Sequence, residues 1–188
     1  MDRIRAFVAL PLPETARARL AALRHAADPG APVRWVAPDA IHLTLKFLGE
    51  IEPARVEAVK EALARHVGER GAFDFTLAGV GGFPALARPR VLWAGVSDGA
   101  PAVVALAERV EGALEPLGFP REARRFTPHV TIGRVKDSPA RAPRNWGERF
   151  GAAASLEPLA VRAETLVLFE SRLSSSGARY SPLLQIAL

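Results

Sequence analysis

Two short segments of this chain repeat one pattern, a histidine and a threonine separated by a single apolar residue. The segments are IHLTLKFL and PHVTIGRV. In a β-strand, residues i and i+2 project from the same face, so His42 projects with Thr44 and His129 projects with Thr131. The apolar residues between them then face the core. The sequence therefore predicts two half-buried strands, each presenting a polar pair.

The two segments end similar runs of predicted elements. An apolar strand that starts at Ile4 and a helix that starts near Pro13 precede His42, while a strand from Val91 and a helix from Pro101 precede His129. This order of elements is that of an internal duplication. It predicts two similar lobes related by a pseudo-two-fold axis, with the two His-x-Thr strands facing each other across a central cleft.

The other predicted elements are mostly strands, with one further helix. Apolar periodicity predicts that helix from Pro53 to the glycine at 68. Stretches with strand character are 33–36, 73–80, 159–162, 165–170 and 180–187, and 81–90 is expected to be a loop. The fold class expected is α+β, bilobal, with an antiparallel sheet and flanking helices in each lobe. Residues 1–188 are expected to form one domain of two lobes.

Composition limits the chemistry that this chain can carry out. It contains no cysteine, which excludes disulfides, thiolate nucleophiles and zinc sites built from cysteine. The formal charge of +5 comes mainly from arginine and suits an anionic ligand such as a nucleic acid, although a codon bias towards arginine would give the same charge. Neither a signal peptide nor an apolar run of membrane-spanning length is recognised. A cytoplasmic monomer is expected.

Two imidazoles and two hydroxyls are a sufficient set of groups for phosphodiester cleavage. One neutral imidazole can take a proton from the nucleophile, and one protonated imidazole can give a proton to the leaving oxygen. The threonine hydroxyls can donate hydrogen bonds to the charged phosphate oxygens, and a nearby arginine can add a charged fork. No metal and no cofactor is required. An RNA-type phosphodiester is therefore the expected substrate.

At this point the sequence resembles a known family, the two-histidine phosphoesterases, and within it the RNA 2′,3′-cyclic phosphodiesterases, historically called 2′-5′ RNA ligases. The paired motifs HLTL at 42–45 and HVTI at 129–132 are that family's most specific feature. The resemblance covers nearly the whole chain. It rests also on the segments RAFVALPLP, IHLTLKFLGE, PRVLWAGV, RFTPHVTIGRV and ESRLSSSGARYSPL.

The resemblance implies a bilobal α+β fold and a metal-free reaction in which water opens a 2′,3′-cyclic phosphate to a 2′-phosphate. It implies that His42 protonates the leaving 3′ oxygen, that His129 activates the water, and that Thr44 and Thr131 hold the phosphate oxygens. The partner implied is an RNA or nucleotide with a cyclic phosphate end. The reverse reaction, ATP-independent 2′-5′ ligation, follows from microscopic reversibility.

Several further residues are candidates for substrate binding. Arg134 matches a phosphate-contacting arginine of the family, but strict alternation from His129 puts it on the opposite face, so it reaches the site only if the strand bends near Gly133. Aromatic residues near the motifs can stack a base, although each is more often core. The full set of binding candidates is Arg134, Phe47, Trp35, Arg125, Phe126 and Tyr180, the last through the family's similar tail alone.

Three other functions remain open on the sequence. The fold can serve to bind RNA or nucleotide ends without catalysis, although binding alone needs no acid and base pair. The bond cleaved can be a linear 2′-5′ linkage, because the motif does not distinguish linear from cyclic esters. Last, the two histidines can ligate zinc together with Asp or Glu, which the threonine at i+2 in both strands disfavours.

Overall fold

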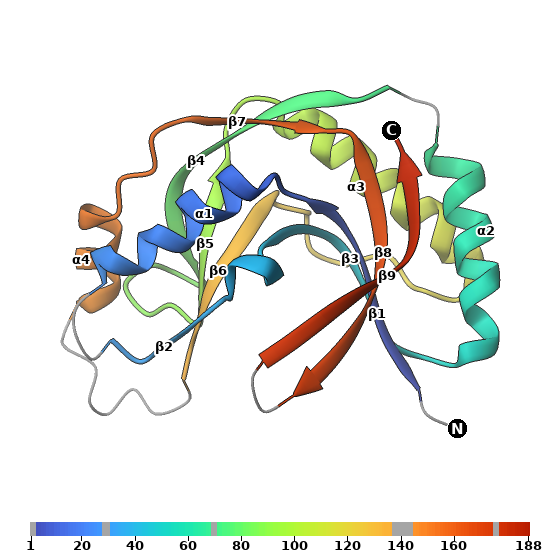
Figure 1. Ribbon diagram of the computed structural model, residues 1–188, viewed down its shortest axis with the longest axis horizontal. Helices are drawn as coiled ribbons and strands as arrows, with labels where there is room; N and C mark the ends of the chain where they lie inside the picture. Colours follow the sequence, from blue (N-terminus) through green and yellow to red (C-terminus); the bar gives the residue numbers. More distant parts are fainter. Residues whose placement is uncertain (1–2, 28–30, 69–70, 137–144, 175–176) are drawn as a thin grey trace.

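The structure is a computed structural model, and it describes residues 3–27, 31–68, 71–136, 145–174 and 177–188. Helices and short 3-10 turns alternate with strands along the chain (Figure 1). The strands are β1 (Ile4–Pro11), β2 (Val33–Trp35), β3 (His42–Ile51), β4 (Phe73–Phe83), β5 (Val91–Val96), β6 (His129–Val135), β7 (Leu159–Ala163), β8 (Thr165–Ser174) and β9 (Gly177–Ala187). The helices are α1 (Glu14–Ala22), α2 (Val56–Val67), α3 (Ala100–Leu114) and α4 (Trp146–Ala153). The 3-10 turns are Leu23–Ala26, Pro38–Ala40, Pro53–Arg55 and Glu115–Leu117.

All the strands belong to one curled antiparallel sheet, in the order β7-β4-β5-β6-β3-β1-β8-β9, with β2 paired to β6. We call β3-β1-β8-β9 the first half-sheet, and β6-β5-β4-β7 with β2 the second half-sheet. The predicted α+β fold with two equivalent halves is confirmed. The halves meet where β3 and β6 pair at Leu43 and Val130, the middle residues of the two His-x-Thr motifs. Both of these residues are fully buried.

The helices lie in two groups at opposite ends of the molecule. In Figure 1, α1 and α4 lie at the left with β2, while α2 and α3 lie at the right near β9 and β3. The apolar stripe predicted for α2 is confirmed, since Val56, Val59, Leu63 and Val67 are buried. We call the side of the sheet that these helices and the apolar side chains cover the core face, and the opposite side, which carries the two histidines, the histidine face.

A β-bulge interrupts each motif strand at the same place. In β3, Val8 pairs with Lys46 and Ala9 pairs with Thr44, so Leu45 has no partner on β1. In β6, Leu92 pairs with Gly133 and Trp93 pairs with Thr131, so Ile132 likewise has no partner on β5. Each unpaired residue stands three positions after the motif histidine. An extra residue in one strand shifts the alternation of side chains by one position beyond it.

The structure differs from the predicted elements in several places, since the last two strands are longer than 165–170 and 180–187. The chain from Gly81 to Phe83 continues β4 and is not a loop. Helix α4 was not predicted, because its two glycines lower helix propensity. Those glycines allow close packing, since a Cβ on Gly147 would collide with the carbonyl oxygen of Leu86 and one on Gly151 would collide with a Leu86 methyl carbon. None of the described helices is long and apolar enough to cross a membrane.

We expect Leu43→Ala to lower the free energy of unfolding by about 2–5 kcal/mol, because it opens a cavity at the seam between the half-sheets. Urea denaturation followed by circular dichroism measures the change. Leu159→Ala, in the outer strand β7, is the matched control, and its smaller loss reflects its partial exposure. An equal loss in both variants would contradict a special role for the seam.

Candidate functional site

The two histidines are held in the same way. The Nδ1 atom of His42 lies 2.8 Å from the carbonyl oxygen of Ala40, and the Nδ1 atom of His129 lies 2.8 Å from that of Thr127. A carbonyl oxygen only accepts, so Nδ1 carries the proton in both rings and donates it to the residue two positions earlier. The other ring nitrogen, Nε2, is thereby left to accept or release a proton at the site.

Burial and positive charge both keep the imidazoles neutral. Burial is the largest cause that lowers the pKa of His42, to about 4 from 6.5, with a smaller contribution from the positive charge of Arg134. Burial also lowers the pKa of His129, and Arg134 adds to that effect. The hydrogen bonds from Nδ1 to the backbone act in the opposite direction. In the free protein both rings are therefore neutral at pH 7.

The threonines lie on the histidine face beside the imidazoles. Because Leu43 and Val130 pair and point into the core, the residues on either side of each point to the other face. The two strands are antiparallel, so His42 lies next to Thr131 across the seam, and Thr44 lies next to His129. Both threonines are half-buried. The structure thus brings the four predicted motif residues together on one face.

The bulges return the fifth residue after each histidine to the histidine face. In β3 this residue is Phe47, which is 54 % exposed, and in β6 it is Arg134, which is also exposed. The positive charge of Arg134 acts on His42, His129 and Tyr180. The obstacle that regular alternation posed for Arg134 is thus removed by the bulge at Ile132. The two halves carry an aromatic ring and a cation in equivalent positions.

Aromatic rings surround His42. Phe7 stacks on its imidazole with ring centroids 4.7 Å apart, and Tyr180 approaches edge-on at 5.2 Å. Phe169 completes this group, 5.3 Å from Phe7. Burial raises the pKa of Tyr180, so its hydroxyl stays protonated and can donate a hydrogen bond. These rings are the physical source of the dry surroundings that lower the pKa of His42.

A smaller aromatic group surrounds His129. Phe83 meets the imidazole edge-on at 5.0 Å, and Trp93 lies 6.4 Å away. The indole of Trp93 lies over Gly81, where a Cβ would overlap the ring. The pairing of Trp93 with Thr131 puts its indole on the histidine face. Sequence reasoning did not place Trp93 at the site, although the alternation of side chains counted from Val91 was a signal that could have placed it there.

The remaining sequence candidates lie elsewhere. Trp35 pairs with Gly133 and packs 5.6 Å from Phe150 of α4, on the core face and away from the histidines. Phe126 is half-buried and packs against the apolar core. Arg125 is exposed in the segment before β6. The structure brings Phe47, Tyr180 and Arg134 to the histidines and does not bring Trp35 there.

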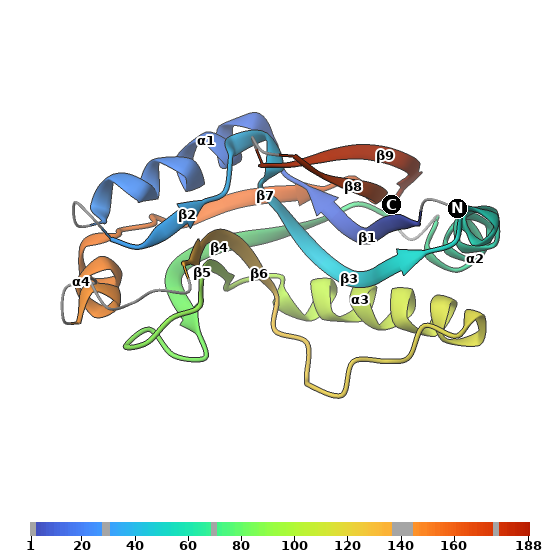
Figure 2. The same cartoon turned by 90° about the horizontal axis from the view of Figure 1, so that it is seen from below.

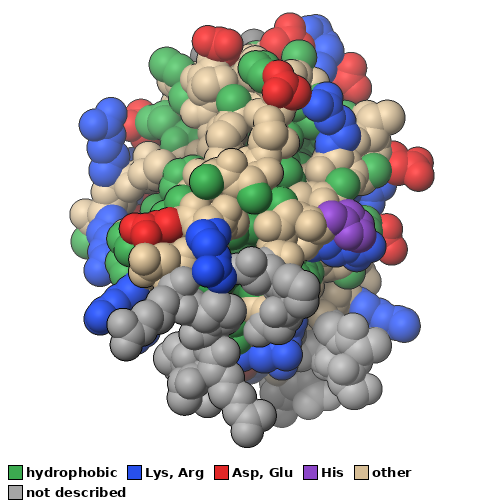
Figure 3. All heavy atoms as spheres, turned by 90° about the vertical axis from the view of Figure 1, so that its left-hand side faces the viewer, with side chains coloured by type: hydrophobic (Ala, Val, Ile, Leu, Met, Phe, Trp, Pro, Cys, Tyr) green, Lys and Arg blue, Asp and Glu red, His purple; other side chains and the backbone are tan. Residues whose placement is uncertain are grey.

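Sequence reasoning overlooked one further cation, Arg34. It pairs with Arg134 across β2 and β6, so the two side chains share the histidine face. Basic side chains are not gathered at the end of the molecule that carries α1 and α4, where Figure 3 shows Lys and Arg among Asp and Glu.

No group of three or more His, Asp or Glu side chains is placed to hold a metal ion within the part of the chain that the structure describes. The zinc alternative therefore has no ligand set among those residues. The arrangement that is present consists of two tautomer-fixed imidazoles, two hydroxyls and a cation on one face of a sheet. This combination suits proton transfer at an anionic ester.

Fold and site together define a two-histidine phosphoesterase. The LigT-like phosphoesterase family profile matches residues 10–93 and 95–180, and the chain belongs to this family. It is 34 % identical to the RNA 2′,3′-cyclic phosphodiesterase of Aeropyrum pernix over 89 % of this chain and 94 % of that protein.

Solved structures show the same fold over nearly the full length. A protein of Thermus thermophilus superposes with a TM-score of 0.80 at 29 % identity, covering 98 % of this chain and 97 % of that one. Escherichia coli LigT in complex with 3′-AMP superposes with a TM-score of 0.77 at 26 % identity, covering 99 % and 98 %. The predicted family is confirmed.

We expect NMR titration of the free protein to show His42 neutral down to about pH 4. In Arg134→Gln the pKa of both imidazoles should rise, because a nearby positive charge that disfavours protonation is gone. Arg162→Gln, on β7, is the control and should leave both titrations unchanged. A fall or no change in the Arg134 variant would show that its charge does not reach the rings.

The same shifts make stability depend on pH. An unfolded histidine takes up a proton near pH 6.5, whereas folded His42 does so only near 4. Stability from this group is complete above pH 6.5 and is lost as the pH falls from there towards 4. Urea denaturation at several pH values should show this loss, and His42→Phe should reduce it. A free energy of unfolding that rises as the pH falls from 6.5 to 4 would contradict the lowered pKa.

Proposed function

We propose that this protein hydrolyses the 2′,3′-cyclic phosphate at the end of an RNA or nucleotide to a 2′-phosphate. The observation that carries the proposal is the pair of imidazoles with Nδ1 protonated and Nε2 free, on one face with Arg134. Relatives named RNA 2′,3′-cyclic phosphodiesterase, and a LigT crystallised with 3′-AMP, support the choice of substrate.

The proposed reaction needs one base and one acid. His129 removes a proton from water, whose oxygen attacks phosphorus, and His42 gives a proton to the 3′ oxygen as its bond to phosphorus breaks. Thr44 and Thr131 donate hydrogen bonds to the non-bridging oxygens, and the Arg134 guanidinium offsets their charge. The resemblance to the family assigns the acid to His42 and the base to His129. The free protein's pKa directions do not select between them.

The charge of the substrate favours the protonated imidazole that the acid step needs and that the free protein lacks. A cyclic phosphodiester brings one negative charge beside Arg134, which offsets the charge that disfavours imidazolium. Binding therefore favours protonation of one ring and couples to proton uptake. The reaction requires no metal ion in this scheme. Ligation, in which a 5′-hydroxyl attacks the cyclic phosphate in place of water, uses the same two groups in the same roles: His129 takes the proton of the hydroxyl, and His42 gives one to the 3′ oxygen as its bond to phosphorus breaks.

The base of the terminal nucleotide is proposed to stack on Phe47. This ring is the most exposed large apolar side chain described and lies 6.0 Å from Phe7 in the aromatic group beside His42. Tyr180, in the same group, lies beside the ribose in this arrangement. Arg125 and Phe126 precede the second motif and are proposed to contact the RNA further from the phosphate. Trp35, on the core face, has no part in the proposed site.

Two alternatives use the same residues. A linear 2′-5′ ester also needs an acid, a base and phosphate donors, so it is a second candidate substrate. Binding of nucleotide ends without turnover is the non-catalytic alternative. The two imidazoles, one from each half-sheet and each fixed by a backbone hydrogen bond, favour turnover. A site that only binds an anion gains little from histidines that burial keeps neutral.

A substrate panel tests the reaction. We expect adenosine 2′,3′-cyclic phosphate to give the 2′-phosphate in the presence of a chelator, and kcat/KM to fall by about 10²–10⁴-fold in His42→Ala and in His129→Ala. His66→Ala, on α2, is the matched control with unchanged activity. Chromatography that separates 2′- and 3′-phosphates reads the product. No turnover of either cyclic or linear esters would leave binding as the function.

Substitution of Phe47 tests base stacking. We expect Phe47→Ala to raise KM for a cyclic nucleotide about tenfold, because stacking on one ring contributes about 1–3 kcal/mol per base. The change in kcat should be small, since the ring does not touch the reacting bond. Ribose 2′,3′-cyclic phosphate, which lacks a base, is the control substrate. An equal rise in KM for both substrates would locate the effect at the phosphate.

A further inference from the structure

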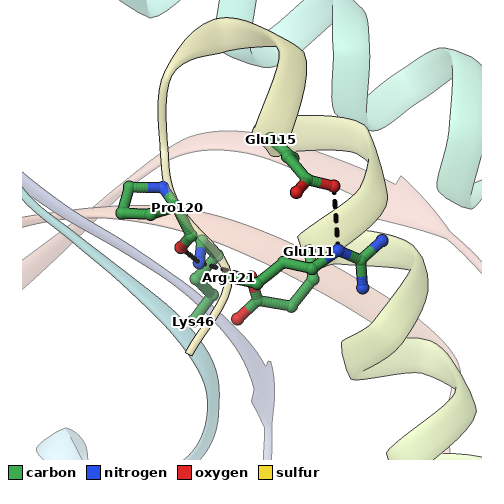
Figure 4. A network of polar contacts seen from close by, with 5 residues as sticks. All are labelled: Lys46, Glu111, Glu115, Pro120 and Arg121. Carbon is green, nitrogen blue, oxygen red and sulfur yellow. Dashed lines mark hydrogen bonds and ion pairs between the residues drawn. The ribbon is translucent and has the colours of Figure 1, made fainter. Parts of the chain in front are cut away.

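Lys46 is the one buried charged or polar side chain among the residues that the structure describes, with 3 % of its surface exposed. It follows the first motif histidine by four positions, and the bulge at Leu45 turns it to the core face. Its Nζ donates to the Glu111 carboxylate at 2.6 Å and to the carbonyl oxygen of Pro120 at 2.8 Å. Figure 4 shows these two contacts converging on the ammonium group.

Both partners belong to the connector that leads to the second motif. Glu111 lies in the last turn of α3, and Pro120 lies in the segment that runs from α3 to β6 and His129. Figure 2 shows α3 beside β3 and this segment returning from its end to β6. Exposed contacts shape the same stretch, since Arg121 pairs with Glu115 at 2.8 Å and Arg55 donates to the carbonyl oxygen of Leu117.

The equivalent position in the second motif strand receives the other connector. Gly133 follows His129 by four positions and also comes directly after a bulge. Its missing side chain leaves room for Val33 and Trp35, where a Cβ would lie 2.7 Å from Val33. These residues belong to β2, in the connector that leads to His42. Each motif strand thus holds, on its core face, the connector that leads to the other histidine.

We propose that Lys46 is a positioning residue, which fixes the connector before β6 and thereby sets where His129 stands relative to His42. The proposal rests on the phosphodiesterase function above. A Lys–Glu pair this deeply buried gains little stability over apolar packing, because desolvation of both charges offsets their attraction. The hydrogen bond to Pro120 gives the pair a positional role, since it fixes the ammonium group to one backbone atom nine residues before His129.

The test compares Lys46→Met with the double variant Lys46→Met/Glu111→Met. We expect the single variant to melt at a lower temperature, because it leaves the Glu111 carboxylate, whose side chain is only 12 % exposed, without its partner. The double variant removes that penalty and should regain most of the melting temperature. In both, kcat for adenosine 2′,3′-cyclic phosphate should fall at least tenfold with KM changed less than threefold, because the Pro120 carbonyl has lost its donor.

Pulsed electron spin resonance supplies a readout that does not depend on turnover. The chain has no cysteine, so Ala58→Cys on α2 and Glu122→Cys in the connector give a single labelled pair. The distance distribution should broaden in both Lys46 variants. Arg162→Met, which removes an ion pair between β7 and β4, is the control and should change neither the distribution nor kcat.

Three results would overturn the proposal. They are a kcat within twofold of wild type in Lys46→Met, a kcat that recovers together with the melting temperature in the double variant, and an unchanged distance distribution. If the wild-type protein hydrolyses no cyclic phosphate, the proposed function fails. The distance distributions still decide whether Lys46 fixes the connector.

Discussion

The pairing of Leu43 with Val130 is the constraint from which the site follows. It joins two half-sheets through the middle residue of each motif, and both residues are fully buried. Because neighbours of a buried strand residue face the other way, one pair of apolar side chains orients two histidines and two threonines at once. The bulges then bring Phe47 and Arg134 to the same face. The polar face is thus specified from beneath by apolar contacts.

The surroundings of the two imidazoles favour the neutral state until an anion arrives. Aromatic rings remove water from His42, and the nearest cation acts in the same direction as burial on its pKa. A backbone acceptor on Nδ1 opposes both effects and, more importantly, fixes which nitrogen is free. The same hydrogen bond holds His129, so the two halves repeat this hydrogen bond as well as the residue. The two halves differ at the fifth position after the histidine, where one half has the ring of Phe47 and the other has the guanidinium of Arg134.

Much of this could be predicted from the sequence, because the motif strands obey the period-two rule. The face of His42 and Thr44, the core role of Leu43 and the equivalence of the halves all follow from it. The bulges could not be predicted, because an unpaired residue such as Ile132 has ordinary strand composition and is revealed only by its neighbour strand. The rule therefore misplaced Arg134. Helix α4 was hidden by Gly147 and Gly151, which serve packing at the expense of propensity, and Trp35 was misjudged because its partner β6 is distant in sequence.

The crossing of the two connectors makes this chain an intramolecular version of a domain swap. The connector before each motif strand is held by the other motif strand, as the pairing of β2 with β6 and the contact of Lys46 with Glu111 show. Buried residues of both halves belong to one hydrophobic cluster, so we expect the two halves to unfold together. The contacts that hold each connector therefore form only when both halves are present in one molecule.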